Sequence, residues 1–205
     1  MRIRENMWYE AIVSVLADGQ PYFTPLGFQI YGNAVKLKVY ISARISSLLT
    51  TYPNAVLNIT DDPHLYFLST FKEETGGIPK EEVGFIDGLP VLRSAYGYII
   101  ARRSKILPQE EVFLFEYRVE KVIENPAYYS SLEPYSRCRA FLIEMIIYAS
   151  KIREVSSKPE REELQERFEK FFDYSHEVVW KTCMDEAELK LASKLKEMVS
   201  GWARK

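Results

Sequence analysis

The chain has 205 residues with a hydrophobic fraction of 47% and a net charge of −2, enough to build a substantial core in one domain or in a domain with an appendage. Residues 1–125 carry 13 Lys and Arg against 15 Asp and Glu, and residues 126–205 carry 14 of each class, so neither half has the basic surface expected of a nucleic-acid-binding protein. The sequence contains no apolar run long enough to cross a membrane and no signal-peptide core near its start, and we therefore expect a cytoplasmic protein.

The first part of the chain predicts β-strands joined by tight turns. Three stretches rich in β-branched and aromatic residues are expected to be strands: 8–16, 22–30 and 35–40. Asp18-Gly19 and Gly32-Asn33 are turn signals between them. Pro25 cannot donate a hydrogen bond to a β-ladder, so it should mark an edge or a bulge.

A short helix is expected over residues 42–53, where Ser42 can cap the first turn and Pro53 ends the helix. A short strand over 55–59 follows. The Asp-Asp-Pro turn at 61–63 then leads into a further helical segment.

Residues 72–90 read as the longest irregular stretch, which in a compact domain is often functional or mobile. Two long strands are expected after it, over 91–103 and 111–124. The total is about six strands joined mainly by hairpins. Closing such strands into a barrel removes exposed edges, so we predict a six-stranded antiparallel β-barrel domain over residues 1–125.

After residue 125 the pattern changes to helices, which are expected over 134–154, 159–183 and 185–201. Asp185 and Glu188 have the spacing of a capping box, and Gly201 suits the position after a helix end. The fold class is therefore α+β, with a helical C-terminal subdomain over residues 126–205.

No sequence motif for metal-dependent or nucleophilic catalysis is present, and no metal site is predicted. Cys138 and Cys183 form no CxxC pair, which excludes a metal knuckle. We interpret them as two buried small side chains, with a disulfide between them left open. His64 and His176 are interpreted as structural or surface residues.

The helix start at residues 42–47 is a candidate anion site. A helix start leaves N–H groups unpaired and carries partial positive charge. Ser42, Ser46 and Ser47 add hydroxyl donors, and Arg44 adds a two-pronged charged donor. A plain serine cap beside a solvated arginine explains the pattern equally well. If the helix start does bind an anion, we predict a phosphorylated cofactor, with flavin mononucleotide (FMN) as the leading candidate.

The segment FTPLGF (23–28) is a second candidate, because Gly27 allows close approach of a ligand and a bulge at Pro25 would free backbone groups to face a ring. A barrel corner without a ligand is an equal alternative. Its candidate cofactor-binding residues are Thr24, Pro25, Leu26 and Gly27.

Residues 58–62 form a third candidate, in which Asn58 and Thr60 share one strand face. We count Asn58, Thr60 and Asp61 among the candidate cofactor contacts. For Asp61 and Asp62 we prefer a turn that caps the following helix over metal ligation.

Four residues line one stripe of the first C-terminal helix: Arg137, Glu144, Tyr148 and Lys151. Buried carboxylates are rare unless paired. We expect Glu144 to be buried and paired with a basic neighbour, although a stripe exposed to water is the alternative.

Four segments together resemble one family: EAIVSV (10–15), FTPLGF (23–28), SARISSLL (42–49) and AVLNITDD (55–62). It is the mainly archaeal domain-of-unknown-function family 447, within the FMN-binding split-barrel superfamily of flavin reductases and pyridoxamine-phosphate oxidases. The resemblance implies a six-stranded split barrel, a homodimer, and FMN near the dimer interface. It places the phosphate motif at Ser42, with Arg44 near a position often occupied by Thr.

Together these features predict an FMN-binding split-barrel protein, which would act as a flavin-dependent oxidoreductase of unknown substrate. Flavin chemistry needs no protein nucleophile, because the cofactor transfers the hydride or electrons. The alternative is a non-enzymatic dimeric interaction module that has lost flavin or uses it only structurally.

Overall fold

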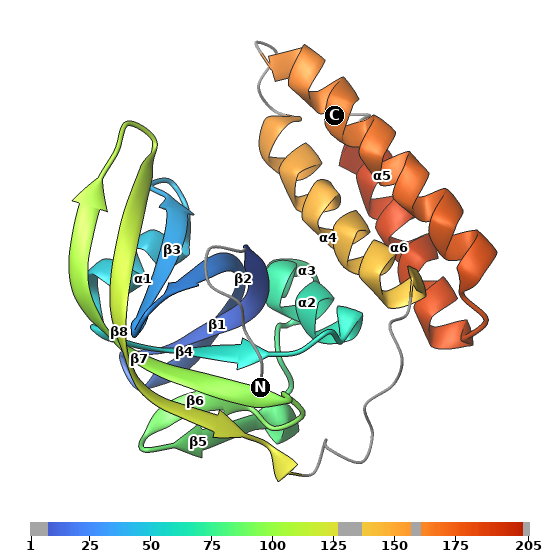
Figure 1. The fold of residues 1–205 in the computed structure, drawn as a ribbon. Coiled ribbons are helices and arrows are strands. Elements are labelled where there is room, and N and C mark those ends of the chain that lie inside the picture. The colour runs from blue at the N-terminus through green and yellow to red at the C-terminus, as the bar shows by residue number, and fades with distance from the viewer. Residues whose placement is uncertain (1–7, 127–136, 157–160, 203–205) are drawn as a thin grey trace. The chain divides into compact units, whose positions relative to one another are not determined.

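The computed structural model describes residues 8–126, 137–156 and 161–202, and they divide into two compact units. The first unit holds residues 8–60 and 72–126 and is mostly β-structure (Figure 1). The second holds residues 61–71, 137–156 and 161–202 and is helical. The segment 61–71, which the sequence analysis placed in the barrel domain, therefore groups with the C-terminal helices.

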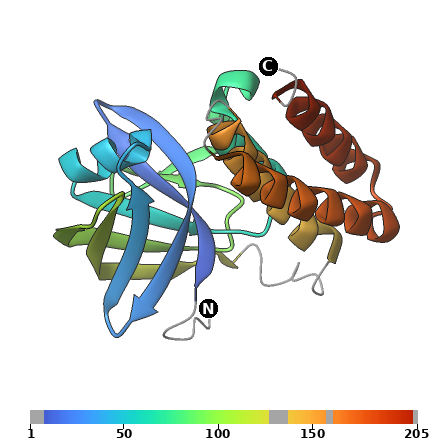
Figure 2. The same cartoon turned by 90° about the horizontal axis from the view of Figure 1, so that it is seen from above.

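The first unit is a closed six-stranded antiparallel barrel in the order β1-β2-β3-β8-β7-β4. Figure 2 shows this unit from above. This architecture confirms the prediction of an α+β fold with a six-stranded barrel. Its strands are β1 (Tyr9–Ala17), β2 (Gln20–Tyr31), β3 (Ala34–Tyr40), β4 (Asn54–Ile59), β7 (Gly97–Pro108) and β8 (Val112–Glu124).

The barrel interior is filled by alternate residues of each strand. In β3, Val35, Leu37 and Val39 are at most 1% exposed, whereas Lys36 and Lys38 point away from the core. This period of two is what a strand with one buried face requires. Phe28, Phe115 and Tyr117 supply the largest side chains of the same core.

Two Asp-Gly turns organise hairpins in the first unit. Asp18 and Gly19 have φ values of 50° and 76°, as a two-residue hairpin turn requires. Asp87 and Gly88 repeat this geometry with 52° and 77°. They join β5 (Val83–Ile86) to β6 (Leu89–Leu92) in a separate two-stranded sheet. The prediction that residues 72–90 are irregular was wrong, since α3 (Lys72–Thr75), η1 (Lys80–Glu82) and this hairpin lie there.

β2 pairs with β1 from Gln20 to Phe28 without a register break, so there is no bulge at Pro25. Its pairing with β3 covers only Phe28–Tyr31 of β2. Pro25 therefore lies on a stretch of strand whose second edge is not paired with β3. The edge alternative was correct, and the open edge is where a missing N–H costs nothing.

Helix α1 (Arg44–Thr51) follows β3 and packs Ile45 and Leu49 into the barrel core. Its N-cap residue is Ala43, which makes no side-chain capping bond, so the predicted cap at Ser42 was wrong by one position. At its other end, Arg103 donates a hydrogen bond to the Leu49 carbonyl, one of the last carbonyls of the helix.

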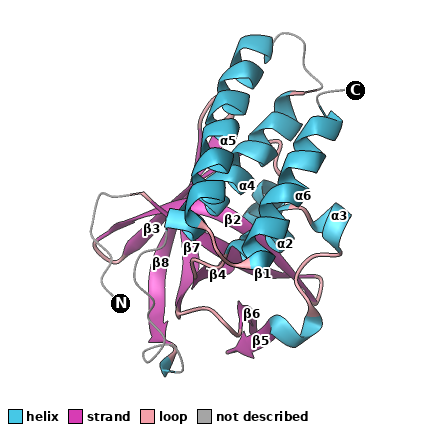
Figure 3. Ribbon diagram, turned by 90° about the vertical axis from the view of Figure 1, so that its right-hand side faces the viewer, coloured by secondary structure: helices cyan, strands magenta, loops and turns pink. Residues whose placement is uncertain are grey.

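The helical unit is built around α4 (Arg137–Val155), which packs against α2 (Pro63–Thr70), α5 (Glu162–Thr182) and α6 (Glu186–Trp202) (Figure 3). Asp62 caps α2 by accepting a 2.8 Å hydrogen bond from the His64 N–H, which confirms the capping turn. None of the helices in the described residues has the length and apolarity needed to span a membrane. The predicted starts of the first and second C-terminal helices, at residues 134 and 159, lie outside the described residues.

The capping box at α6 is half formed. The Asp185 carboxylate accepts hydrogen bonds from the N–H groups of Ala187 (2.8 Å) and Glu188 (3.1 Å). The Glu188 carboxylate does not complete the box, because it pairs with Arg139 at 3.1 Å. Gly201 lies within α6 rather than after it, so the prediction of a terminating glycine was wrong.

A disulfide joins Cys138 on α4 to Cys183, the residue after α5. Both half-cystines are 4% exposed. The bond answers the question that the sequence left open, and it ties together two helices that already pack against each other.

Glu144 is exposed on α4, so the expectation of a buried, paired carboxylate was wrong. Arg137 and Lys151 of the same stripe are exposed as well. The Lys151 ammonium lies 5.1 Å from the centre of the Tyr148 ring, where cation–π attraction holds it.

Candidate functional site

The site begins at the edge of β2 that β3 leaves uncovered. Among the described strands, residues 20–27 of β2 pair only with β1. Because Ala17 and Gln20 flank a two-residue turn, the odd-numbered residues of β2 direct their backbone groups away from β1. Pro21 and Pro25 have no N–H, so the N–H groups of Phe23 and Gly27 are the donors on this edge. The end of β3 pairing, rather than a bulge, exposes these groups.

Side chains of this chain account for the need for a glycine at position 27. A Cβ atom on Gly27 would lie 3.3 Å from the Glu10 Oε1 atom and 3.6 Å from the Trp8 ring. The close approach that this glycine permits is therefore made by the side chains of β1 and the residue before it.

Two cationic side chains converge on the half-buried ring of Tyr22, near the start of β2. The Arg44 guanidinium, from the first residue of α1, lies 5.3 Å from the ring centre. The Lys72 ammonium, from the first residue of α3, lies 4.6 Å from it. Each position is favourable for a cation over an aromatic ring, and together they gather two positive charges at one place.

The electrostatics of this cation pair favour an added anion. The pKa of Lys72 is lowered to about 8, chiefly by burial and also by the charge of Arg44, while Glu73 partly opposes the shift. Burial also raises the pKa of the Tyr22 phenol, while Arg44 lowers it. A bound anion would stabilise both cations, since an opposite charge nearby favours the charged form of a base.

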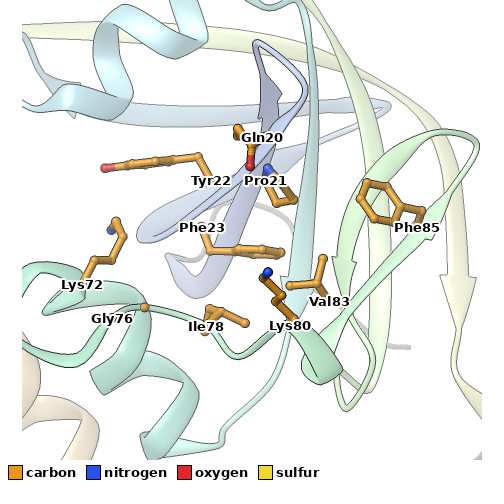
Figure 4. A pocket seen from close by; sticks show the side chains of 11 residues that line it. Gln20, Pro21, Tyr22, Phe23, Lys72, Gly76, Ile78, Lys80, Val83 and Phe85 are labelled. Atoms are coloured by element: carbon orange, nitrogen blue, oxygen red, sulfur yellow. The ribbon is translucent and has the colours of Figure 1, made fainter.

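A pocket of about 410 Å³ opens beside the cation pair, with Lys72 and Tyr22 in its wall (Figure 4). The pocket lies between the first residues of β2 and the segment that leads from α3 to β5. Its wall is formed by Gln20, Pro21, Tyr22, Phe23, Lys72, Gly76, Gly77, Ile78, Lys80, Val83 and Phe85.

The four candidate residues around α1 have different surroundings in the structure. Arg44 belongs to the cation pair, and Ser42 is exposed just before the helix. The Ser47 hydroxyl is exposed and donates to the Arg44 carbonyl at 2.9 Å. Ser46 is 1% exposed on the inner face of the helix, and its hydroxyl has no hydrogen-bond partner among the described residues. Helical geometry thus directs Ser46 away from the surface where Ser42 and Ser47 lie.

Thr24 and Leu26 lie on β2 opposite Val13 and Ala11. Leu26 is partly buried against the barrel core, and Thr24 and Pro25 are half-buried. Thr60, the residue after β4, is 7% exposed, and Asp61 is exposed.

Asn58 holds three strands together. Its Nδ2 donates to the Ile12 carbonyl at 2.8 Å and to the Ser14 hydroxyl at 3.0 Å, and its Oδ1 accepts from the Leu92 N–H at 2.8 Å. Asn58 is fully buried. Because these bonds use both ends of the amide, we assign Asn58 a structural role, and contact with a cofactor stays a prediction.

We expect Asn58→Ala to lower the free energy of unfolding by roughly 1–3 kcal/mol, because it strands the buried N–H of Leu92. Urea denaturation of wild type and variant measures the change. Asn33→Ala, at an exposed turn position, is the matched control and should change stability by about 0.5 kcal/mol or less. Equal stabilities for Asn58→Ala and wild type would contradict the structural role.

One cluster in the described residues has the composition of a metal site, formed by Cys138, Cys183 and Glu188. The two sulfur atoms are joined in the disulfide and offer no thiolate. His176 accepts a 2.8 Å hydrogen bond from the Trp180 indole, and His64 is exposed.

Four residues of the cation pair and the pocket were not predicted from the sequence: Tyr22, Lys72, Lys80 and Phe85. Lys72 and Lys80 flank Gly76-Gly77 within the stretch read as a loop. Basic residues on both sides of a glycine pair were the available signal, and the convergence of Lys72 on Tyr22 is a tertiary effect.

The model for the N-terminal domain of a family of proteins of unknown function, DUF447, matches residues 9–125. A comparison with curated proteins found no match.

Three solved structures share the fold at low sequence identity. An FMN-bound protein of the DUF447 family from Methanosarcina mazei is 18% identical, with 96% of each chain covered and a TM-score of 0.78. The flavin reductase HpaC, complexed with NADP⁺, is 19% identical over 59% of this chain and 81% of its own, with a TM-score of 0.50. The styrene monooxygenase flavin reductase from Pseudomonas putida S12 is 19% identical over 57% and 81%, also with a TM-score of 0.50.

Proposed function

The chain belongs to the DUF447 family, and from that premise we propose that it binds FMN and acts as a flavin-dependent oxidoreductase. The M. mazei structure supports the cofactor, because that relative is FMN-bound and is covered over 96% of its length. The fold shared with flavin reductases supports the reaction class. Fold likeness alone names no substrate.

The observation that carries the proposal is the cation pair on Tyr22. Arg44 and Lys72 lie 5.3 and 4.6 Å from the same ring centre. A phosphate group accepts charge-assisted hydrogen bonds from both kinds of cation, and arginine can offer two at once. The exposed hydroxyl of Ser42, two residues before the first residue of α1, would add a donor. The residues present therefore fit a phosphomonoester.

The open edge of β2 would hold the ring system of the cofactor. Residues 24–27 expose alternate backbone N–H and carbonyl groups there, and such groups can hydrogen-bond the polar edge of a flavin. Bound flavin would supply the hydride or electron transfer. The chain itself would bind the phosphate, orient the ring and limit its contact with water.

Titration of the purified protein with FMN tests the cofactor proposal, followed by assay of NADH and NADPH oxidation. We expect saturable quenching of flavin fluorescence, with weaker binding of riboflavin. Failure to bind at millimolar FMN would exclude the cofactor. Binding without turnover of either nicotinamide would favour the non-enzymatic interaction module, with flavin in a structural role.

We also propose a homodimer. Several large apolar side chains of the barrel unit are exposed, among them Trp8 (54%), Tyr40 (57%) and Ile41 (45%). Exposed apolar patches commonly mark surfaces that a partner covers. Light scattering at micromolar concentration should give twice the 23.9 kDa mass of the chain. A monomer mass would contradict the dimer and would support a flavin site complete within one chain.

The predicted cytoplasmic location is retained as part of this proposal. The Cys138–Cys183 disulfide is unusual for that location, because stable disulfides are uncommon in cytosolic proteins except those of hyperthermophiles.

A further inference from the structure

We propose that the pocket beside Tyr22 binds a nucleoside phosphate, so that the chain holds a second nucleotide unit next to the phosphate of its flavin. This inference rests on the proposed FMN site for the first phosphate. The occupant is either the adenylyl half of flavin adenine dinucleotide (FAD) or a separate adenine nucleotide. The two sources share one chemistry, which is a flat ring joined to a phosphate.

The positions of the basic residues support two linked anionic groups. Lys72 belongs to both the cation pair and the pocket wall. Lys80, at the start of η1, lines the same pocket, and its amine is directed into the space beside Phe23 (Figure 4). The pocket continues directly from the proposed phosphate position, because Tyr22 and Lys72 line both. Arg44, Lys72 and Lys80 thus provide cations for one phosphate and for a second one beyond it.

The pocket wall is suited to an aromatic ring. Phe85 on β5 is 57% exposed although it lines the pocket, whereas Phe23, which also lines it, is 4% exposed. An exposed phenylalanine beside a cavity offers a face on which a base can stack. Apart from Lys72 and Lys80, the lining is largely apolar or aromatic.

The pocket also has room for more than an anion. Gly76 and Gly77 form part of its wall with φ values of 83° and 81°. Gly76 is exposed, and a Cβ atom on it would meet nothing within 4 Å. The volume of about 410 Å³ falls in the range of sites for small organic ligands, which is roughly 300–1,000 Å³.

Binding of FMN, FAD, AMP and ADP to wild type, Lys80→Ala and Phe85→Ala tests the proposal. Both substitutions change exposed side chains and should leave folding intact. Lys38→Ala and Tyr31→Ala, exposed on the barrel outside the pocket lining, are the matched controls. If the occupant is the adenylyl half, both pocket variants should weaken FAD by about tenfold or more while FMN affinity is unchanged.

If the occupant is a separate nucleotide, AMP or ADP should bind protein already saturated with FMN, and Lys80→Ala should weaken that binding by a similar factor. The inference is overturned if neither pocket variant changes FAD, AMP or ADP affinity, whether or not FMN binds. Failure of the FMN proposal gives a different result. The protein would not bind FMN, but it would still bind AMP or ADP, and that binding would depend on Lys80.

Discussion

Reduction of the Cys138–Cys183 disulfide should lower the free energy of unfolding of the helical unit by about 4 kcal/mol. The bond closes a loop with a sequence separation of 45 residues, and the chain-entropy model gives roughly 3 kcal/mol for a 15-residue loop and 4.7 for a 100-residue loop. Reduction also leaves two buried thiols beside the Glu188 carboxylate, whose Oε2 atom lies 2.8 Å from the Cys138 sulfur.

Urea melts followed by helical circular dichroism, with and without dithiothreitol, measure this effect. The double variant Cys138→Ser, Cys183→Ser is the control, since its transition should not respond to the reductant. Identical transitions for oxidised and reduced wild type would show that the disulfide does not stabilise the unit.

Arg44→Ala should weaken FMN binding by about ten- to more than a hundred-fold and leave riboflavin binding nearly unchanged. Only FMN carries the phosphate, and a hydrogen bond to a charged group contributes roughly 1.5–3 kcal/mol. Lys72→Ala should behave in the same way if both cations contact the phosphate. Fluorescence titration with the two ligands gives the ratio, and Lys38→Ala is the matched control for loss of a surface charge. Equal losses for FMN and riboflavin would show that Arg44 does not contact the phosphate.

The same measurement repeated with pH tests the role of Lys72. Its pKa is lowered to about 8 by burial, with Arg44 acting in the same direction. The ammonium is therefore charged below that pH and becomes neutral above it. FMN affinity should fall as the pH rises through about 8 in wild type, whereas Lys72→Met should show a flatter profile over that range.

The barrel was predictable because its signals are local. The alternation of Val35, Leu37 and Val39 with lysines marks one buried strand face, and Asp18-Gly19 marks the hairpin that sets the register of β1 and β2. The hairpin at Asp87-Gly88 has the same dipeptide but was missed, since β5 and β6 have only four residues each. Strands that short carry too few alternations to stand out from a loop.

The candidate site could be predicted only at residues whose own position in the sequence suggests a ligand contact. Arg44 follows from a basic residue at a helix start. Lys72 does not, because it lies 50 positions after Tyr22 and meets that ring only through the path of the folded chain. Ser46 illustrates a different limit of the sequence, since its hydroxyl suggested a ligand contact while the helical period places it on the buried face with Ile45 and Leu49; its contact with a cofactor stays a prediction.

The uncovered edge of β2 also bears on solubility. An open strand edge is a template on which another chain can add a strand, and this leads to aggregation. Along residues 20–27 the outward positions include Pro21 and Pro25, which cannot donate to an incoming strand. The edge that the end of the β3 pairing leaves open to a small ligand is therefore a poor partner for a second β-strand, because these two prolines interrupt its row of donors.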